Sequence, residues 1–173
     1  MSEAVRLAHH DFYSDRRIRT ILANVRTVAM VGASTLWRRP SYYAMKYLQK
    51  RGYRVIPVNP TRAGAELLGE NVYPDLASIP GNVDMVDIFR PSEEAVDIAR
   101  DVIACKDDKG IEILWMQLSV RNDEAARLAE EAGLVVVMDR CPKIEYARLS
   151  GELGWSGINS GIVTAKSLRP PRA

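Results

Sequence analysis

Short apolar segments alternate with amphipathic segments along most of this chain. Five runs are apolar almost without interruption: Thr27–Val31, Arg54–Val58, Val83–Phe89, Ile111–Met116 and Leu134–Met138. Such continuous hydrophobicity is typical of parallel strands that are covered by helices on both faces. The pattern therefore predicts five buried strands.

The segments between these runs have the composition and spacing of helices. The predicted helices are Ser14–Val25, Ser41–Arg51, Ser92–Lys106, Asn122–Ala132 and Lys143–Leu149. Ser41, Ser92 and Asn122 can each cap a helix N-terminus, because each offers a side-chain oxygen to unpaired backbone N–H groups. The three middle helices are followed by glycine, which readily adopts the left-handed conformation that ends a helix. The longer connection Thr61–Pro80 contains two glycines and two prolines, which argue against a long helix there.

Strands that alternate with helices predict an α/β protein with right-handed crossovers. We expect a Rossmann-like three-layer fold with a five-stranded, mainly parallel sheet. Residues 1–149 would form this domain together with an N-terminal helical arm. Residues 150–173 are rich in Gly and Ser and end in a Pro-rich basic tail, so we expect an arm that packs on the domain or on a partner subunit of a homo-oligomer.

Length and composition narrow the class of protein. The 173 residues are enough for one domain with a core, and the formal net charge of +2 gives no reason to propose a nucleic acid partner. No apolar run approaches the roughly 20 residues that span a bilayer, so no membrane association is expected. The two cysteines fit a reducing compartment, which predicts a cytoplasmic protein.

The two histidines, His9 and His10, both precede the first predicted strand. We interpret them as part of a solvated arm, because a metal pair without further ligands nearby is weak. No histidine follows any strand, so neither a Ser-His-Asp nor a Cys-His pair can be assembled there. The sequence also lacks a Gly-Lys-Ser phosphate loop. We therefore expect a binding protein without catalytic activity and without a metal.

Ligands of open parallel sheets bind outside the carboxyl ends of the strands. The first strand is followed by Gly32, Ala33 and Ser34, a turn that lets a phosphate approach backbone amides at a helix N-terminus. Arg38 and Arg39 precede Pro40 and add guanidinium groups suited to phosphate. The alternative is an ordinary tight turn followed by a solvated loop.

The second strand ends in Asn59 and Pro60. NAD-binding proteins usually have an acidic residue at this position, which accepts from the ribose hydroxyl. A neutral Asn59 with Arg62 close by disfavours NAD and suits a ribose that carries an extra phosphate, as in NADP or coenzyme A. An Asx turn that ends the strand is the structural alternative.

The last three strands end in further candidates: Phe89, Arg90 and Pro91, then Trp115 and Gln117, then Cys141. Taken singly, Phe89 and Trp115 suit core packing equally well. Arg140 is expected to lower the pKa of Cys141, whose thiolate could then exchange with a disulfide of coenzyme A. The alternative is an unreactive small residue in a turn. Cys105 lies within a predicted helix and is expected to pack.

Six blocks of sequence carry a resemblance to a known family: VGAS at 31–34, RPSY at 39–42, GYRVIPVNP at 52–60, VDMVDIFR at 83–90, WMQL at 115–118 and VVMDRCP at 136–142. Together they resemble the small stand-alone CoA-binding proteins, relatives of the CoA-binding domain of the succinyl-CoA synthetase alpha subunit. The resemblance implies a Rossmann-like fold that binds coenzyme A across the strand ends.

The resemblance also implies roles for individual residues. The diphosphate would lie among Gly32, Ala33, Ser34, Arg39, Pro40 and Ser41. Asn59 and Pro60 would lie at the adenosine end, Phe89, Arg90 and Pro91 beside the nucleotide, and Trp115, Gln117 and Cys141 further along the crevice.

Two positions depart from the family pattern. The family often has a glycine at position 119 and a lysine at position 61, where this chain has Ser119 and Thr61. The second departure leaves Arg62 or Arg39 as the candidate for contact with the 3′-phosphate. We expect a non-catalytic carrier, sensor or accessory protein that binds coenzyme A or an acyl-CoA. The alternative is an NADP-binding, reductase-like protein.

Overall fold

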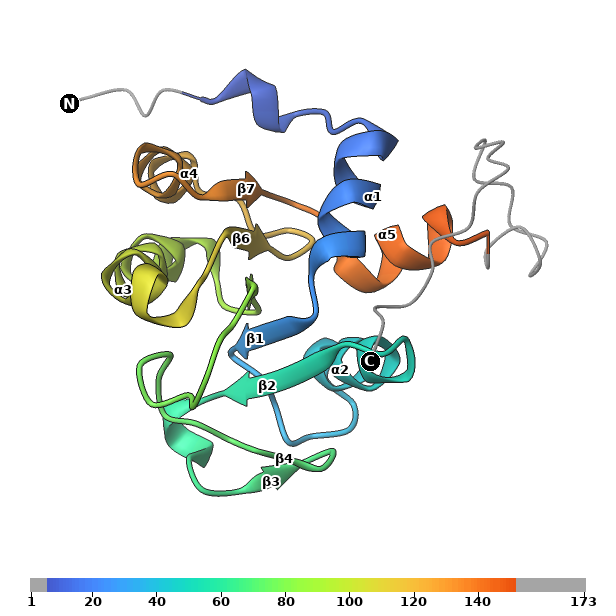
Figure 1. Ribbon diagram of the computed structural model, residues 1–173, viewed down its shortest axis with the longest axis vertical. Coiled ribbons are helices and arrows are strands. Elements are labelled where there is room, and N and C mark those ends of the chain that lie inside the picture. Colours follow the sequence, from blue (N-terminus) through green and yellow to red (C-terminus); the bar gives the residue numbers. More distant parts are fainter. Residues whose placement is uncertain (1–5, 152–173) are drawn as a thin grey trace.

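The computed structural model describes residues 6–151, which form a three-layer α/β fold (Figure 1). The central sheet has five parallel strands in the order β2-β1-β5-β6-β7. The strands are β1 (Thr27–Val31), β2 (Arg54–Val58), β5 (Met85–Ile88), β6 (Ile113–Met116) and β7 (Val135–Val137). The predicted fold class is confirmed. The proposed C-terminal arm, residues 150–173, falls almost entirely outside the described residues.

Five α-helices cover the two faces of this sheet (Figure 1). α1 (Asp15–Asn24), α2 (Pro40–Lys50) and α5 (Pro142–Leu149) pack on one face, and α3 (Ala95–Lys109) and α4 (Asp123–Glu131) on the other. Alternate strand residues supply the two cores: Val28 and Met30 face the first layer, and Ala29 faces the second. This alternation explains why the strands are apolar at nearly every position.

The predicted element boundaries are mostly confirmed, and the differences have local causes. β1 and β2 have the predicted limits, whereas the last three strands are shorter because the apolar runs continue into the flanking turns. Asn122 caps α4 as predicted, through a hydrogen bond from Ala125 N. The predicted caps Ser41 and Ser92 are wrong. Pro40 already begins α2, and the Ser92 hydroxyl accepts a hydrogen bond from Arg121 N instead.

The connection after β2 contains structure that the sequence did not predict. A 3₁₀ turn, Pro60–Arg62, leads into a small hairpin of β3 (Glu66–Leu67) and β4 (Glu70–Asn71). Its two turn residues, Leu68 and Gly69, both have positive φ, as a tight hairpin turn requires. The guanidinium of Arg54 joins both carboxylate oxygens of Glu70 at 3.0 and 3.2 Å, which ties the hairpin to the edge of the sheet.

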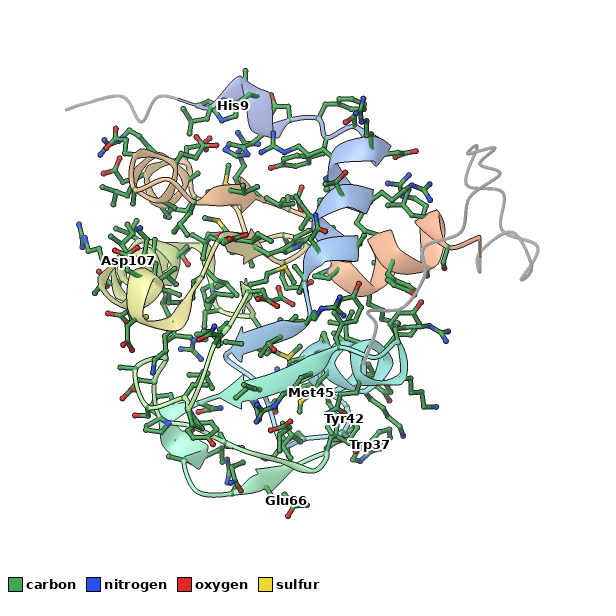
Figure 2. All side chains as sticks on the ribbon, in the orientation of Figure 1. His9, Trp37, Tyr42, Met45, Glu66 and Asp107 are labelled. Carbon is green, nitrogen blue, oxygen red and sulfur yellow. The ribbon has the colours of Figure 1, made fainter. Side chains whose placement is uncertain are left out.

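The N-terminal segment is packed more tightly than the sequence predicted. A 3₁₀ turn, Ala8–His10, lies beside α4, and the labelled His9 marks its position in Figure 2. His10 is buried, and its Nδ1 lies 2.7 Å from the hydroxyl of Tyr13. Burial lowers the pKa of His10, and the nearby carboxylate of Glu130 partly opposes this effect. The expectation of a solvated histidine arm is therefore wrong for His10, because contacts distant in sequence bury it.

No helix among the described residues is long and apolar enough to cross a membrane.

Gly32 brings the end of β1 against the end of β5. Its φ is +86°, in the left-handed region, and a Cβ atom there would lie 2.6 Å from the carbonyl oxygen of Phe89 and 2.7 Å from Cδ of Arg90. A side chain at this position therefore meets backbone that belongs to the neighbouring strand end.

We predict that Gly32→Ala lowers the free energy of unfolding by about 2–4 kcal/mol, because it combines backbone strain with overpacking. Gly64→Ala is the matched control: Gly64 has φ +81° but no atom within 4 Å of the added Cβ. Urea denaturation of both variants measures the difference. Equal losses in the two proteins would show that the approach to Phe89 is not tight.

Candidate functional site

The strand order reverses between β1 and β5, where the chain first turns to β2 on one side and then crosses to the other. In open parallel sheets, such a switch point leaves a crevice at the carboxyl ends of the strands. Two pockets open along this edge, one on each side of the sheet. Their positions agree with the expectation that function lies after the strand ends.

The first pocket has a volume of about 620 Å³ and lies next to α3; we call it the α3-side pocket. Gly32 and the turn Asn59–Thr61 form one wall, and α3 forms the opposite wall with Ile98 and Asp101. Leu76 adds apolar surface, while the acidic groups Asp75 and Glu94 are also at its lining. The pocket therefore combines an apolar patch with several hydrogen-bond acceptors.

The second pocket has a volume of about 730 Å³ and lies beside α2 and α5; we call it the α5-side pocket. Its walls are largely apolar, and Arg38, Arg90 and Lys143 bring positive charge. The apolar lining consists of Pro40, Tyr43, Ala44, Phe89, Pro91, Leu118, Val120 and Ile144. α2 and α5 both begin at this pocket, so the positive ends of two helix dipoles are directed towards it.

Arg90 lines both pockets and lies between them. Its side chain, 48% exposed, passes next to Gly32, and its guanidinium joins both carboxylate oxygens of Glu94 at 2.8 Å. An exposed ion pair of this kind contributes little to stability. The Arg90 guanidinium can therefore exchange the carboxylate for another anion at small cost.

Side chains hold the loop after β1 in place. The Asn59 amide donates to the carbonyl oxygen of Ala33 at 2.8 Å, and its Oδ1 accepts from Thr61 N. The Ser41 hydroxyl accepts from Ser34 N at 3.0 Å. The amide of Gly32 donates to the carbonyl oxygen of Val58. These groups already have partners within the protein, so they order the loop.

The structure brings most of the predicted site residues to one of the two pockets. Gly32, Asn59 and Pro60 line the α3-side pocket, and Arg90 lines both. Pro40, Phe89, Pro91, Gln117 and Cys141 line the α5-side pocket. The remaining predicted residues line neither pocket: Ala33, Ser34, Arg39, Ser41, Arg62 and Trp115.

Trp115 requires a correction. Its side chain is completely buried in the core beneath α1, α2 and α5, and Nε1 donates a 2.7 Å hydrogen bond to the carbonyl oxygen of Arg140. The expectation that it lines the crevice is wrong. Trp115 lies within β6, whereas residues that follow the strand, from Gln117 on, reach the pocket.

A buried acidic residue lies beneath the α5-side pocket. Asp87 in β5 is fully buried, and Gln117 Nε2 donates to its two carboxylate oxygens at 3.0 and 3.2 Å. Burial raises the pKa of Asp87 from its ordinary 3.8 to about 8, an effect that the hydrogen bond from Gln117 partly opposes. Burial therefore favours the protonated form of Asp87, and the contact between the two side chains orients Gln117 at the pocket wall.

Cys141 lines the same pocket but does not have the predicted reactivity. Burial raises the pKa of its thiol, although backbone N–H groups of Ile144 and Lys143 at the start of α5 act in the opposite direction. Arg140 is not among the groups that shift the pKa of this thiol; its guanidinium lies over the ring of Tyr13, 5.5 Å from the centroid. The expectation of a pKa lowered by Arg140 is therefore wrong.

Several pocket residues were not among the predicted site residues. Lys143 lies two residues after the predicted Cys141, and its charge was the available signal. Asp87 interrupts an otherwise apolar strand, which marks it in the sequence as an unusual buried acid. Ser119 has φ +68°, in the left-handed region, which explains physically why a glycine suits this position.

Comparisons with known proteins agree with this fold. Residues 26–147 match the family model described as "CoA binding domain". The chain is 34% identical over 134 residues to the uncharacterized protein YneT of Bacillus subtilis, covering 78% of this chain and 95% of YneT. Solved structures that resemble it include a hypothetical protein from Pyrococcus horikoshii (36% identity, TM-score 0.74, 86% and 99% covered). Another is a protein from Thermus thermophilus, with 36% sequence identity and a TM-score of 0.73; the match covers 79% of this chain and 98% of that protein.

We predict that Asp87→Asn removes a pH dependence of stability. The raised pKa means that the folded protein binds a proton that the unfolded chain releases, so the free energy of unfolding falls as the pH rises between about 4 and 8. The expected slope is about 1.4 kcal/mol per pH unit. Urea denaturation at pH 5, 6, 7 and 8 tests this. A slope in Asp87→Asn as steep as in the wild type would assign the effect to another group.

Proposed function

This chain belongs to the family of CoA-binding domains, and from that premise we propose that it binds coenzyme A or an acyl-CoA across both pockets. The nucleotide would occupy the α3-side pocket and the pantetheine arm the α5-side pocket. The observation that carries this proposal is Arg90, which lines both pockets at the point where the strand order reverses. A ligand with a central diphosphate and two chemically different ends fits such an arrangement.

The α3-side pocket suits the adenosine end. Leu76 and Ile98 offer apolar surface to a flat base, and the carboxylates of Asp75 and Asp101 can accept hydrogen bonds from an amino group or a ribose hydroxyl. Arg62 directly follows the lining residue Thr61 and is exposed, while Arg90, the basic residue of the lining itself, is assigned to the diphosphate. We assign the 3′-phosphate contact to Arg62.

The diphosphate would be held by side chains more than by the loop after β1. The amides of Gly32 and Ser34 already donate to Val58 and Ser41, whereas Arg38 and Arg90 line the α5-side pocket. Arginine binds phosphate oxygens through two parallel hydrogen bonds. On this proposal the diphosphate replaces Glu94 as the partner of Arg90.

The α5-side pocket suits the pantetheine arm. Its apolar walls can cover the methyl and methylene groups of the arm, and Gln117 can bond to an amide. No catalytic step is part of the proposal. Three basic side chains, Arg38, Arg90 and Lys143, line this pocket, and burial raises the pKa of the Cys141 thiol. The protein would act as a carrier, a sensor or an accessory protein.

We predict that coenzyme A binds more tightly than dephospho-CoA, by roughly 10- to 150-fold for one charged contact of about 1.5–3 kcal/mol. In Arg62→Gln this difference should disappear, while the affinity for dephospho-CoA stays unchanged. Isothermal titration calorimetry with coenzyme A, dephospho-CoA, NADP, NAD and ADP provides the measurement. Binding of NADP alone would contradict the proposed function. An undiminished preference in Arg62→Gln would contradict only the assignment of Arg62.

We also predict that Arg90→Gln weakens binding of coenzyme A by roughly 10- to 150-fold, because it removes a charged contact to the diphosphate. Arg127→Gln is the control, since Arg127 on α4 forms only exposed ion pairs with Glu124 and Glu131 in the described structure. Both variants are compared with the wild type by the same calorimetry, after circular dichroism has shown that they are folded. Equal affinity in Arg90→Gln and the control would place the diphosphate elsewhere.

A further inference from the structure

A cluster of three metal-ligating side chains lies apart from the two pockets. His9 and His10 come from the N-terminal 3₁₀ turn, and Glu130 comes from α4. Their candidate ligand atoms all lie within 4.8 Å of one another. None of the three residues lines either pocket, and the function proposed above does not use them.

The Nε2 atoms of both imidazole rings lie close to the same carboxylate. Nε2 of His9 lies 3.1 Å from each oxygen of Glu130, and Nε2 of His10 lies 3.2 Å from Oε1. Neighbouring ligand atoms in a tetrahedral zinc site are about 3.3–3.5 Å apart, given bonds of about 2.0–2.2 Å. Both histidine–carboxylate distances are therefore close to the spacing that a shared cation requires, and the ligand atoms of the two histidines lie within 4.8 Å of each other.

His10 provides an independent indication. Its side chain has no exposed surface, and its buried Nε2 has no hydrogen-bond partner although the Glu130 carboxylate is close. Buried polar atoms in folded proteins are nearly always satisfied, so one without a partner calls for an explanation. A cation coordinated by Nε2 would supply the missing interaction.

The other nitrogen of His10 is arranged as in known metal sites. Its Nδ1 lies 2.7 Å from the hydroxyl oxygen of Tyr13, which also accepts a 2.8 Å hydrogen bond from Met138 N. When Nδ1 carries the proton and donates it to Tyr13, the lone pair of Nε2 is free to coordinate a metal. Metal-binding histidines commonly have such a second partner, which fixes the ring orientation.

Two arginines near the Glu130 carboxylate, Arg121 and Arg17, are engaged with other groups. Arg121 is bound to Asp11 and Asp123 at 2.7 and 2.9 Å. The guanidinium of Arg17 lies 5.5 Å from the centroid of the Tyr13 ring and donates to the carbonyl oxygen of Val136. Both arginines therefore have partners other than Glu130.

We propose that His9, His10 and Glu130 form a binding site for a divalent transition-metal ion such as Zn²⁺. Two neutral imidazoles and one carboxylate bind zinc in preference to calcium or magnesium, which favour oxygen ligands. A water molecule would complete the coordination. The ion joins the N-terminal turn to α4, two segments that are 121 residues apart in sequence. The site is structural and separate from the binding of coenzyme A.

Zinc binding to tag-free protein tests this proposal. After equilibrium dialysis against Zn²⁺ and then metal-free buffer, elemental analysis should find about one zinc per wild-type chain. Co²⁺ should give the visible absorption of a four-coordinate site. A saturating concentration near 100 times the dissociation constant should raise the melting temperature by about 5–10 °C.

Variants distinguish this site from adventitious binding. His9→Ala and Glu130→Gln should lower the zinc affinity by at least about 100-fold. His9 is used because its side chain is half exposed, so its removal leaves the core intact. Glu131→Gln, next to Glu130 on α4, and Cys105→Ser and Cys141→Ser should bind zinc as the wild type does. Absence of zinc binding in the wild type, or unchanged affinity in His9→Ala, would overturn the proposal. Titration with coenzyme A should give the same affinity in His9→Ala, Glu130→Gln and Glu131→Gln as in the wild type. Cys105→Ser and Cys141→Ser are left out of this comparison, because these residues line the α3-side and the α5-side pocket.

Discussion

The candidate site depends on the close approach of two neighbouring strand ends, which only a residue without a side chain permits. Gly32 lies so near the carbonyl oxygen of Phe89 that a Cβ atom would be 2.6 Å away. This approach places Arg90 beside the turn after β1, and Arg90 in turn separates and connects the two pockets. The proposed path of the ligand between the two pockets depends on this contact.

The sequence predicted the backbone of this site better than its side chains. The limits of β1 and β2 were correct because each run ends at a residue, Gly32 or Asn59, that cannot easily continue a buried strand. That a residue follows a strand in the sequence did not show whether its side chain points into a pocket. Asn59, Ser34 and Ser41 are engaged in hydrogen bonds that order the loop, and Trp115 is buried below the crevice. The burial of His10 depends on Tyr13 and α4, so no local pattern could predict it.

The buried carboxyl group of Asp87 positions a polar side chain of the α5-side pocket. The carboxyl group lies within the sheet, where its ionised form is unfavourable, and its only direct side-chain partner among the described residues is Gln117. Because Gln117 also lines the α5-side pocket, the buried acid fixes a polar group at a wall that is otherwise largely apolar. Substituting an apolar residue for Asp87 would leave the Gln117 amide without this partner.

The ends of the sheet have a consequence for how copies of this protein can associate. At the β2 edge, Pro57 lacks an N–H group and its carbonyl oxygen accepts from Tyr73 N, while Asn59 N donates to the carbonyl oxygen of Tyr73. At the β7 edge, Arg17 donates to the carbonyl oxygen of Val136, and the Tyr13 hydroxyl accepts from Met138 N. Each of these contacts occupies a backbone group that strand-to-strand pairing would use. A second copy that extends the sheet at either edge would have to break them.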